Sequence, residues 1–189
     1  IESKQNYLKH LGNEIVTTLS ESSRFFATTD FSNLRTCDVI IICVPTPLGN
    51  HQEPDLSYII NSAKRIGESL HPGQLIILES TTYPRTTRDE MLPAILNAAE
   101  RNDEYSVGEN IFVAFSPERE DPGRKDHSTS TIPKLVGGLD EQSTSLAAQV
   151  YRKGVAEVVE VASAEIAESA KLLENIFRAV NIALVNEMK

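Results

Sequence analysis

"IFVAFSPERED", from Ile111 to Asp121, joins an apolar run to a cluster of charged residues. Five residues that suit a buried strand are followed by Ser116, Pro117 and Glu118. A carboxylate at the end of a buried strand can act as a general base if it faces a ligand-binding crevice. The alternative is an ordinary solvated loop, in which such a carboxylate is exposed. The elements around this stretch have to distinguish the two.

Two other predicted strands also end in small hydroxyl residues and prolines. The run "IIICV" is followed by Pro45, Thr46 and Pro47, and the run "LIILE" is followed by Ser80, Thr81 and Thr82. Ligands of parallel α/β sheets bind beyond the carboxyl ends of the strands, and turn residues there let a ligand approach the backbone. Each ending alone is better explained as a simple turn. Taken together, the three endings fit a binding site as well as they fit plain turns.

Strands alternate with amphipathic helices along the chain. Residues 39–47 are uncharged, rich in β-branched residues and too short for a helix, which predicts a central strand of a parallel sheet with both faces covered. The other predicted strands are 24–30, 74–81, 111–118, 132–138 and 157–163, and the predicted helices are 56–70, 86–100, 140–153 and 164–189. Asp55 is predicted to cap the first helix, and Pro93 marks either a kink or a helix start.

This alternation predicts an α/β fold with a doubly wound, mostly parallel sheet. Strand–helix–strand repeats favour right-handed crossovers, which place helices on both faces of an open sheet. The pattern is Rossmann-like but incomplete. It ends in a helix that has no Gly or Pro and is long for a globular protein.

Composition and charge argue against several kinds of function. The 189 residues carry a formal net charge of -9, so no basic stripe is available to neutralise the phosphates of a nucleic acid. No apolar run is long enough to span a bilayer, and no signal peptide is visible. Cys37 and Cys43 lie in or beside an apolar segment. They are interpreted as reduced core residues rather than a disulfide or a metal site, which favours a cytoplasmic setting.

Six stretches, in this order, resemble the nucleotide-sugar 6-dehydrogenases, which include the UDP-glucose, UDP-N-acetylglucosamine and UDP-N-acetylmannosamine dehydrogenases. The stretches are "VIIICVPTPL", "EPDLSYI", "ESTTYPRTT", "FSPEREDPG", "IPKLVGG" and "AKLLENIFRAVNIALVNEM". "SPERE" followed by "DPG" is most similar to the branch that acts on UDP-N-acetylhexosamines, in which glycine often stands at the position of Arg85. The resemblance implies NAD as cofactor and oxidation of the sugar's C6 hydroxyl to a carboxylate, through a cysteine-bound thiohemiacetal and thioester.

The resemblance also implies catalytic roles. Lys171 matches a helix lysine that stabilises a developing oxyanion, and Asn175 lies one turn later on the same face. Glu118 matches the acid that positions or deprotonates the hydrolytic water. Thr81 matches a strand-end threonine near the nicotinamide and the reacting carbon. Without the resemblance, the helix pair is a polar stripe on a solvated helix, and the other two are a loop carboxylate and a turn hydroxyl.

The implied cofactor contacts come from the three strand ends. They are Val44, Pro45, Thr46, Ser80, Thr81 and Glu118. Glu120 corresponds to a second family acid, although the loop spacing differs from that of the UDP-glucose branch. Arg178 either reaches an anionic ligand or a partner chain, or is an exposed helix arginine. No metal ligand is expected.

Two parts that the family needs do not occur in these 189 residues. No G-x-G-x-x-G turn is available to cradle a pyrophosphate. Neither Cys37 nor Cys43 suits the catalytic cysteine, which in this family belongs to a later domain. We therefore expect a fragment that is inactive alone. Residues 1–161 would be the later part of an NAD-binding Rossmann-like domain, and 162–189 the start of a central helix.

Two other interpretations stay open. In the first, the chain is a non-catalytic relative that uses the helix 164–189 only for dimerisation, because its apolar residues suit either a core or a partner helix. In the second, it is a GDP-mannose 6-dehydrogenase, which shares the architecture. The expected partners are a UDP-sugar substrate and a second copy of the chain, bound through the long helix.

Overall fold

The computed structural model describes residues 12–49, 53–118 and 132–189. These residues fall into two compact units, which divide between Asn33 and Leu34. The five strands of the described chain lie in the second unit, which therefore carries the sheet and the strand-end loops. The predicted boundary at residue 161, between a cofactor domain and a central helix, stays a prediction.

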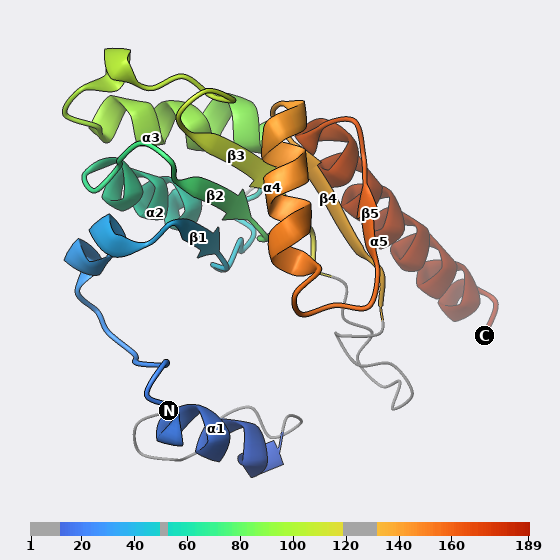
Figure 1. Ribbon diagram of the computed structural model, residues 1–189. Coiled ribbons are helices and arrows are strands. Elements are labelled where there is room, and N and C mark those ends of the chain that lie inside the picture. Colours follow the sequence, from blue (N-terminus) through green and yellow to red (C-terminus); the bar gives the residue numbers. More distant parts are fainter. Residues whose placement is uncertain (1–11, 50–52, 119–131) are drawn as a thin grey trace. The chain divides into compact units, whose positions relative to one another are not determined.

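The first unit contains helix α1, Gly12–Glu21 (Figure 1). Residues 24–30 form no strand, so the strand predicted from "RFFATTD" is wrong. A strand is stable only as part of a sheet, and no strand of the described chain pairs with these residues. A short 3-10 helix, η2 (Phe31–Thr36), follows, and within it Ser32 donates its backbone N–H to the carboxylate of Asp30 at 2.9 Å.

The second unit is built on a five-stranded sheet in the order β1-β2-β3-β4-β5. Its strands are β1 (Val39–Ile42), β2 (Leu75–Leu78), β3 (Phe112–Phe115), β4 (Lys134–Gly138) and β5 (Val158–Glu160). The first three run parallel as adjacent strands, and β5 runs parallel to β4. This confirms the predicted α/β class with a mostly parallel sheet. Each of these strands falls within a range predicted from the sequence.

β4 runs antiparallel to β3, with Phe115 opposite Gly137. No helix was predicted between these two strands, so this antiparallel step agrees with the prediction of a mostly parallel sheet. Antiparallel neighbours need no crossover helix, because the chain turns back at one edge of the sheet. As a result, Lys134 at the start of β4 lies at the edge where the three parallel strands end.

Helices cover both faces of the sheet (Figure 1). The helices of this unit are α2 (Ser57–Gly67), α3 (Leu92–Ala98), α4 (Glu141–Tyr151) and α5 (Ala164–Glu187). α4 lies on one face, where Ala147 and Tyr151 pack against alternate residues of the strands. The other three helices pack against the remaining strand residues on the opposite face. The strands therefore lie between two apolar layers, as their alternating side chains require.

The predicted helix starts are only partly correct. The helix predicted from residue 140 begins as α4 at Glu141, and Asp140 caps it, with its carboxylate accepting the backbone N–H of Ser143 at 2.9 Å. At α2 the N-cap position is occupied by Leu56, which makes no capping bond. Asp55 was predicted to cap this helix, but it accepts the N–H of Ser57 at 2.8 Å from one residue before the cap.

The predicted helix 86–100 has two parts. A π-helix, η3 (Thr86–Met91), runs directly into α3, and a 3-10 turn, η4 (Asn102–Glu104), follows. Pro93 lies in the first turn of α3. Pro93 therefore marks the start of α3 inside a continuous helical segment rather than a free helix end.

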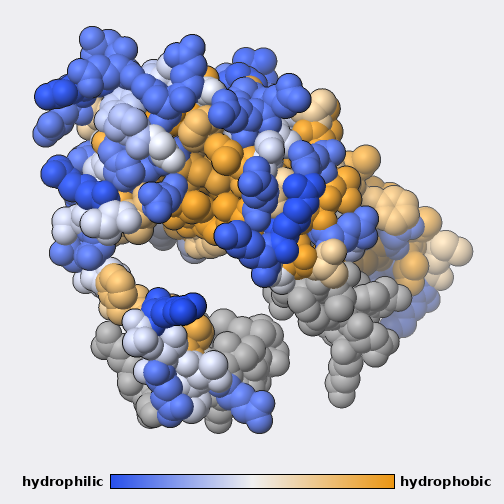
Figure 2. All heavy atoms as spheres, viewed as in Figure 1, coloured by the Kyte–Doolittle hydropathy of each residue, from blue (hydrophilic) through white to orange (hydrophobic). Residues whose placement is uncertain are grey.

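β1 forms one edge of the sheet, and α4 does not cover the face of β1 that lies on the α4 side. Val39 and Ile41 pair in register with Leu75 and Ile77, which lie in the layer under α4. The two β1 residues are nevertheless 36% and 43% exposed. The prediction of a central strand with both faces covered is therefore wrong for the described chain. Figure 2 shows apolar side chains gathered on the sheet beside α4.

α5 exposes much of its apolar side chain area. Its exposed large apolar residues are Ile166, Leu173, Ile176, Phe177, Val180, Ile182, Leu184 and Val185. This surface agrees with the expectation that the helix packs against something beyond its own sheet. None of the helices in the described ranges combines the length and the apolar character that a membrane crossing requires.

Candidate active site at the carboxyl edge of the sheet

The loops after β1 and β2 are joined by hydrogen bonds. Ser80 Oγ accepts the N–H of Val44 at 2.9 Å and donates to the carbonyl oxygen of Val44 at 2.8 Å. Thr46 Oγ1 donates to the carbonyl oxygen of Thr81 at 2.8 Å. Pro45 and Thr81 are exposed, whereas Ser80 is buried. The structure thus brings five of the predicted cofactor residues into one surface, at the edge where ligands of such sheets bind.

Thr82 adds a buried hydroxyl to this edge. The residue is 5% exposed, and its Oγ1 makes no hydrogen bond within the described part of the chain. An unpaired buried polar group costs about 1–3 kcal/mol, and most such groups are paired. The unpaired hydroxyl of Thr82, one residue after Thr81, is consistent with a hydrogen bond to a molecule bound at this edge.

Glu118 forms an ion pair with Lys134. The Lys134 Nζ lies 2.6 Å from Oε2 of Glu118 and 3.0 Å from Oε1 of Glu79. The side chains of Lys134 and Glu79 are 7% and 15% exposed, and that of Glu118 is 40% exposed. Glu118 is therefore not an ordinary solvated loop carboxylate, because one of its oxygens is held against the end of the sheet.

Tyr151 and Cys43 also bind the carboxylate of Glu79. The Tyr151 hydroxyl donates to Oε1 at 2.5 Å, and the Cys43 thiol donates to Oε2 at 3.2 Å. The Lys134 Nζ lies 5.0 Å from the centroid of the Tyr151 ring, within the range of a cation–π contact. Burial alone would raise the pKa of Glu79. The hydrogen bond from Tyr151 and the charge of Lys134 outweigh it, so this pKa lies below its ordinary value.

The Cys43 thiol is poorly suited to nucleophilic catalysis. Burial, the hydrogen bond to Glu79 and the charge of that carboxylate raise the pKa of Cys43 to about 12. Because the thiolate is the nucleophile, this group is almost entirely unreactive at neutral pH. The Cys43 residue is exposed although its thiol is hydrogen-bonded to Glu79, so its prediction as a core residue is wrong, whereas Cys37 is half-buried; both are free thiols.

Lys171 and Asn175 lie on the inward face of α5. Ala164 and Ala167 of the same face belong to the core, and Lys171, one turn further on, is 9% exposed. Asn175 follows after another turn and is half-buried. A stripe on a solvated helix, the alternative interpretation, is therefore wrong for Lys171.

Glu168 fixes α5 to the segment that follows β2. Its Oε1 accepts the N–H and the hydroxyl of Thr87 at 2.9 and 2.7 Å, and its Oε2 accepts the N–H of Arg85 at 2.5 Å. The side chain is fully buried, and burial raises the pKa of Glu168 although the bonds from Thr87 and Arg85 oppose this. Lys171 is one turn later on the same helix, so these bonds hold its turn of α5 near the segment that follows β2.

The backbone conformation at Arg85 explains why glycine suits this position of the family pattern. Its backbone is left-handed, with φ 79°. Residues with a Cβ are disfavoured in this region, and glycine is not. The Arg85 side chain pairs with Asp89 at 2.6 Å, and its neighbour Arg88 pairs with Glu165 of α5 at 2.5 Å.

Two further predicted site residues are Arg178 and Glu120. Arg178 pairs with Glu174 on the same helix at 3.7 Å. This contact supports the interpretation of Arg178 as an ordinary helix arginine rather than a ligand or partner contact. Glu120 lies outside the described residues. Glu118 and Lys171 approach the carboxyl edge from opposite faces of the sheet. Lys134, the partner of Glu118, lies on the same face of β4 as Val136 in the α4 layer, and α5 packs on the other face.

Three residues of this edge were not predicted from the sequence. They are Glu79, Lys134 and Tyr151. A signal existed for two of them, since Lys134 is the only charge in "IPKLVGG" and Glu79 ends "LIILE". A charge in an otherwise buried strand has to be paired, which predicts a partner without naming it. Tyr151 gave no such signal, because it occupies an ordinary inward position of a helix.

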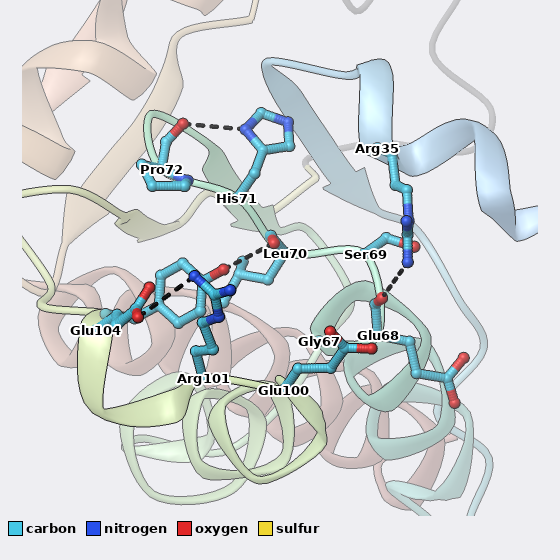
Figure 3. Close-up of a pocket in the computed structure, with 11 residues that line it drawn as sticks. Arg35, Gly67, Glu68, Ser69, Leu70, His71, Pro72, Glu100, Arg101 and Glu104 are labelled. Carbon is cyan, nitrogen blue, oxygen red and sulfur yellow. Dashed lines mark hydrogen bonds and ion pairs between the residues drawn. The ribbon is translucent and has the colours of Figure 1, made fainter.

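A separate pocket lies at the amino edge of the sheet (Figure 3). Its volume is about 590 Å³, and it is lined by residues that precede β1, β2 and β3, among them Arg35, His71 and Tyr105. Arg35 donates to the carbonyl oxygen of Glu68 at 3.4 Å, and Tyr105 donates to that of Leu70 at 2.8 Å. None of the predicted site residues lines this pocket.

The parallel strands, the helices on both faces and the joined strand-end loops define a dinucleotide-binding type of α/β domain. A family model gives the particular family. The NAD-binding domain of the UDP-glucose/GDP-mannose dehydrogenase family matches residues 3–155, and the chain belongs to this family. The match confirms the predicted family and its cofactor, NAD.

Two relatives of this chain are named as dehydrogenases of nucleotide sugars. It is 36% identical over 171 residues to UDP-N-acetyl-D-glucosamine 6-dehydrogenase of Pseudomonas aeruginosa, covering 90% of this chain and 40% of that protein. It is 38% identical over 155 residues to UDP-N-acetyl-D-mannosamine dehydrogenase of Pyrococcus horikoshii, covering 82% and 36%.

A solved structure shows the same fold. NDP-N-acetyl-D-galactosaminuronic acid dehydrogenase from Methanosarcina mazei superposes with a TM-score of 0.81 at 32% identity. The superposition covers 93% of this chain and 37% of that one. The chain therefore spans about two fifths of the length of the relatives that it matches.

Proposed function

We propose that this chain is the cofactor-binding part of an enzyme that oxidises the C6 hydroxyl of a UDP-N-acetylhexosamine to a carboxylate with NAD. The observation that carries the proposal is the carboxyl edge, where the joined strand-end loops lie beside Glu118 and the turn of α5 that bears Lys171. The choice of sugar is supported by relatives named for UDP-N-acetylglucosamine and UDP-N-acetylmannosamine.

The strand-end surface suits the cofactor. Val44, Pro45 and Thr46 form a turn that is held against Ser80 and Thr81, so backbone and hydroxyl groups are fixed at the edge before a ligand binds. When bound, NAD supplies a hydride acceptor. The role of these five residues is to orient it and to hold its reactive end beside Thr81.

Lys171 and Asn175 stabilise charge on the substrate. Both lie on one face of α5, and Lys171 is 9% exposed. A positive group that is largely removed from water interacts more strongly with a developing oxyanion than a solvated one does. Asn175 donates its amide N–H to the same oxygen from one turn away.

Glu118 acts as the general base of the hydrolytic step. It takes a proton from water as the water oxygen bonds to the carbonyl carbon of a thioester, and the carbon–sulfur bond then breaks and releases a cysteine thiolate. The raised pKa of Cys43 argues against this chain's own strand-end thiol as that cysteine. The 189 residues alone are therefore proposed to be inactive.

The apolar surface of α5 is proposed to form a homodimer. Leu173, Phe177 and Val180 are 69%, 70% and 60% exposed on one stripe of the helix, which a second copy of α5 would bury. A cytoplasmic setting belongs to the same proposal and is supported by the two free thiols.

The test uses the protein expressed from its complete gene. NADH formation is followed with UDP-N-acetylglucosamine, UDP-N-acetylmannosamine, UDP-glucose and GDP-mannose. We expect turnover of a UDP-N-acetylhexosamine with about two NADH per sugar, because the product is a carboxylate. Turnover of GDP-mannose alone would assign the enzyme to the other branch. Absence of turnover with every sugar would support the dimerisation module.

A matched pair of variants tests the site. Lys171→Met is expected to lower kcat by about 100-fold or more, as loss of an oxyanion-stabilising group does. Lys153→Met, at an exposed lysine after α4, should leave turnover unchanged. Sedimentation velocity should show the same oligomer for both variants. A broken oligomer with normal turnover in Lys171→Met would contradict the catalytic role.

A further inference from the structure

Lys134 lies between the carboxylates of two strand ends. Its Nζ is 2.6 Å from Oε2 of Glu118, after β3, and 3.0 Å from Oε1 of Glu79, after β2. This position depends on the antiparallel direction of β4, which brings the first residue of that strand to the edge where its neighbours end. A parallel strand would place this lysine at the opposite edge.

The two carboxylates differ in how firmly they are held. Glu79 accepts hydrogen bonds from the Tyr151 hydroxyl at 2.5 Å and the Cys43 thiol at 3.2 Å, in addition to its contact with Lys134. The Tyr151 ring also lies against the ammonium. Glu118 is 40% exposed and reaches the site edge. The cluster therefore has a fixed side, made of Glu79 and Tyr151, and a side that faces solvent, made of Glu118.

We propose that Lys134 is a positioning residue for Glu118 in the hydrolytic step. Anchored by Glu79 and Tyr151, its ammonium binds Oε2 of Glu118, so that Oε1 is the oxygen that takes the proton from water. This inference rests on the proposed function, because it assigns the partner of the general base. Lys134 itself touches neither substrate nor cofactor in this arrangement.

One consequence separates this role from a purely structural one. The ion pair fixes the direction of the Glu118 carboxylate, which a general base requires. A lysine that only tied β4 to the sheet would affect the stability of the domain, but its loss would not be equivalent to the loss of Glu118 in turnover.

The experiment is a double-mutant cycle on the complete protein, with Lys134→Met, Glu118→Gln and the pair, in which kcat and KM are measured from NADH formation. Lys134→Met is expected to lower kcat by about tenfold or more, a part of the roughly 10²–10⁴-fold that general-base catalysis provides. The KM values for NAD and for the sugar should stay within about twofold, because Lys134 touches neither ligand in this arrangement. In the Glu118→Gln background the same change should have little further effect, because both variants remove one function.

Two further variants keep the result decisive. If Lys134→Met does not fold, Lys134→Gln replaces it, since glutamine removes the charge and shortens the side chain, and the same fall in kcat at an unchanged KM is expected. Lys153→Met is the control for loss of an exposed lysine. A folded Lys134 variant with an unchanged kcat, or full additivity in the cycle, would overturn the inference alone. An inactive wild-type protein would overturn the proposed function and this inference with it.

Discussion

Glu168 of α5 accepts both the backbone N–H and the hydroxyl of Thr87, at 2.9 and 2.7 Å, although the two residues are 81 positions apart in the chain. The same carboxyl group also accepts the N–H of Arg85 at 2.5 Å. These three bonds join the helix that bears Lys171 to the segment that follows β2. One fully buried acidic side chain therefore holds α5 against the segment that follows β2.

Glu168→Ala should destabilise the domain strongly. The substitution leaves two backbone N–H groups and a hydroxyl unsatisfied in the interior, so we expect the free energy of unfolding to fall by about 2–4 kcal/mol. Glu168→Gln should cost less, because its carbonyl oxygen still accepts from Thr87 while its amide faces the Arg85 N–H. Urea unfolding followed by circular dichroism measures both. Glu187→Ala, at the exposed end of α5, is the control, and an equal effect there would contradict the prediction.

Arg85→Gly should be more stable than Arg85→Ala. Both variants lose the exposed ion pair with Asp89, but only glycine is free of the penalty for a backbone with φ 79°. We expect a difference of about 1 kcal/mol in the free energy of unfolding. Thermal and urea unfolding of the two variants measure this difference. Equal stability would mean that the segment adopts another backbone conformation.

The pair of Arg88 and Glu165 should make stability depend on acidic pH. Burial alone would raise the pKa of Glu165, but the bond and charge of Arg88 lower it to about 2, from an ordinary value of 4.5. A carboxylate with a lowered folded-state pKa adds stability above its unfolded value, and this stability is lost as the pH falls from 4.5 towards 2.

The matched variant for this pair is Glu165→Gln, which does not titrate. The wild-type chain should lose more unfolding free energy than Glu165→Gln between about pH 5 and 2. The difference should be no more than about 1 kcal/mol, because Arg88 is partly exposed and screened by water. Urea midpoints across this pH range provide the measurement. Parallel curves for the two proteins would show that the pair contributes nothing.

Cys43 should react slowly with alkylating reagents at neutral pH, even though it is exposed. With a pKa of about 12, its thiolate is scarce, so we expect alkylation about 10²–10³-fold slower than for a free cysteine. Glu79→Gln should accelerate the reaction, because it removes a carboxylate that disfavours the thiolate. Iodoacetamide labelling in a Cys37→Ser background measures Cys43 alone. A rate equal to that of free cysteine would refute the prediction.

The elements and their order could be predicted from the sequence because their signals are local. Uncharged runs rich in β-branched residues gave β1, β2 and β3, and apolar residues at helical spacing gave the helices between them. The strand at 24–30 failed because the same local signal also needs a partner strand, which residues 24–30 do not have in the described chain. The exposed face of β1 failed for a related reason, since burial depends on which helix lies over a strand.

The sequence by itself determined the fold class, the strand-end turns and the positions of Glu118 and Lys171 on their elements, because turn chemistry and periodicity are properties of neighbouring residues. Only the tertiary structure decided which of these groups meet. The direction of β4 is set by packing over the whole sheet, and it places Lys134 between Glu118 and Glu79. An ion pair between strands depends on distances in space that no spacing along the chain encodes.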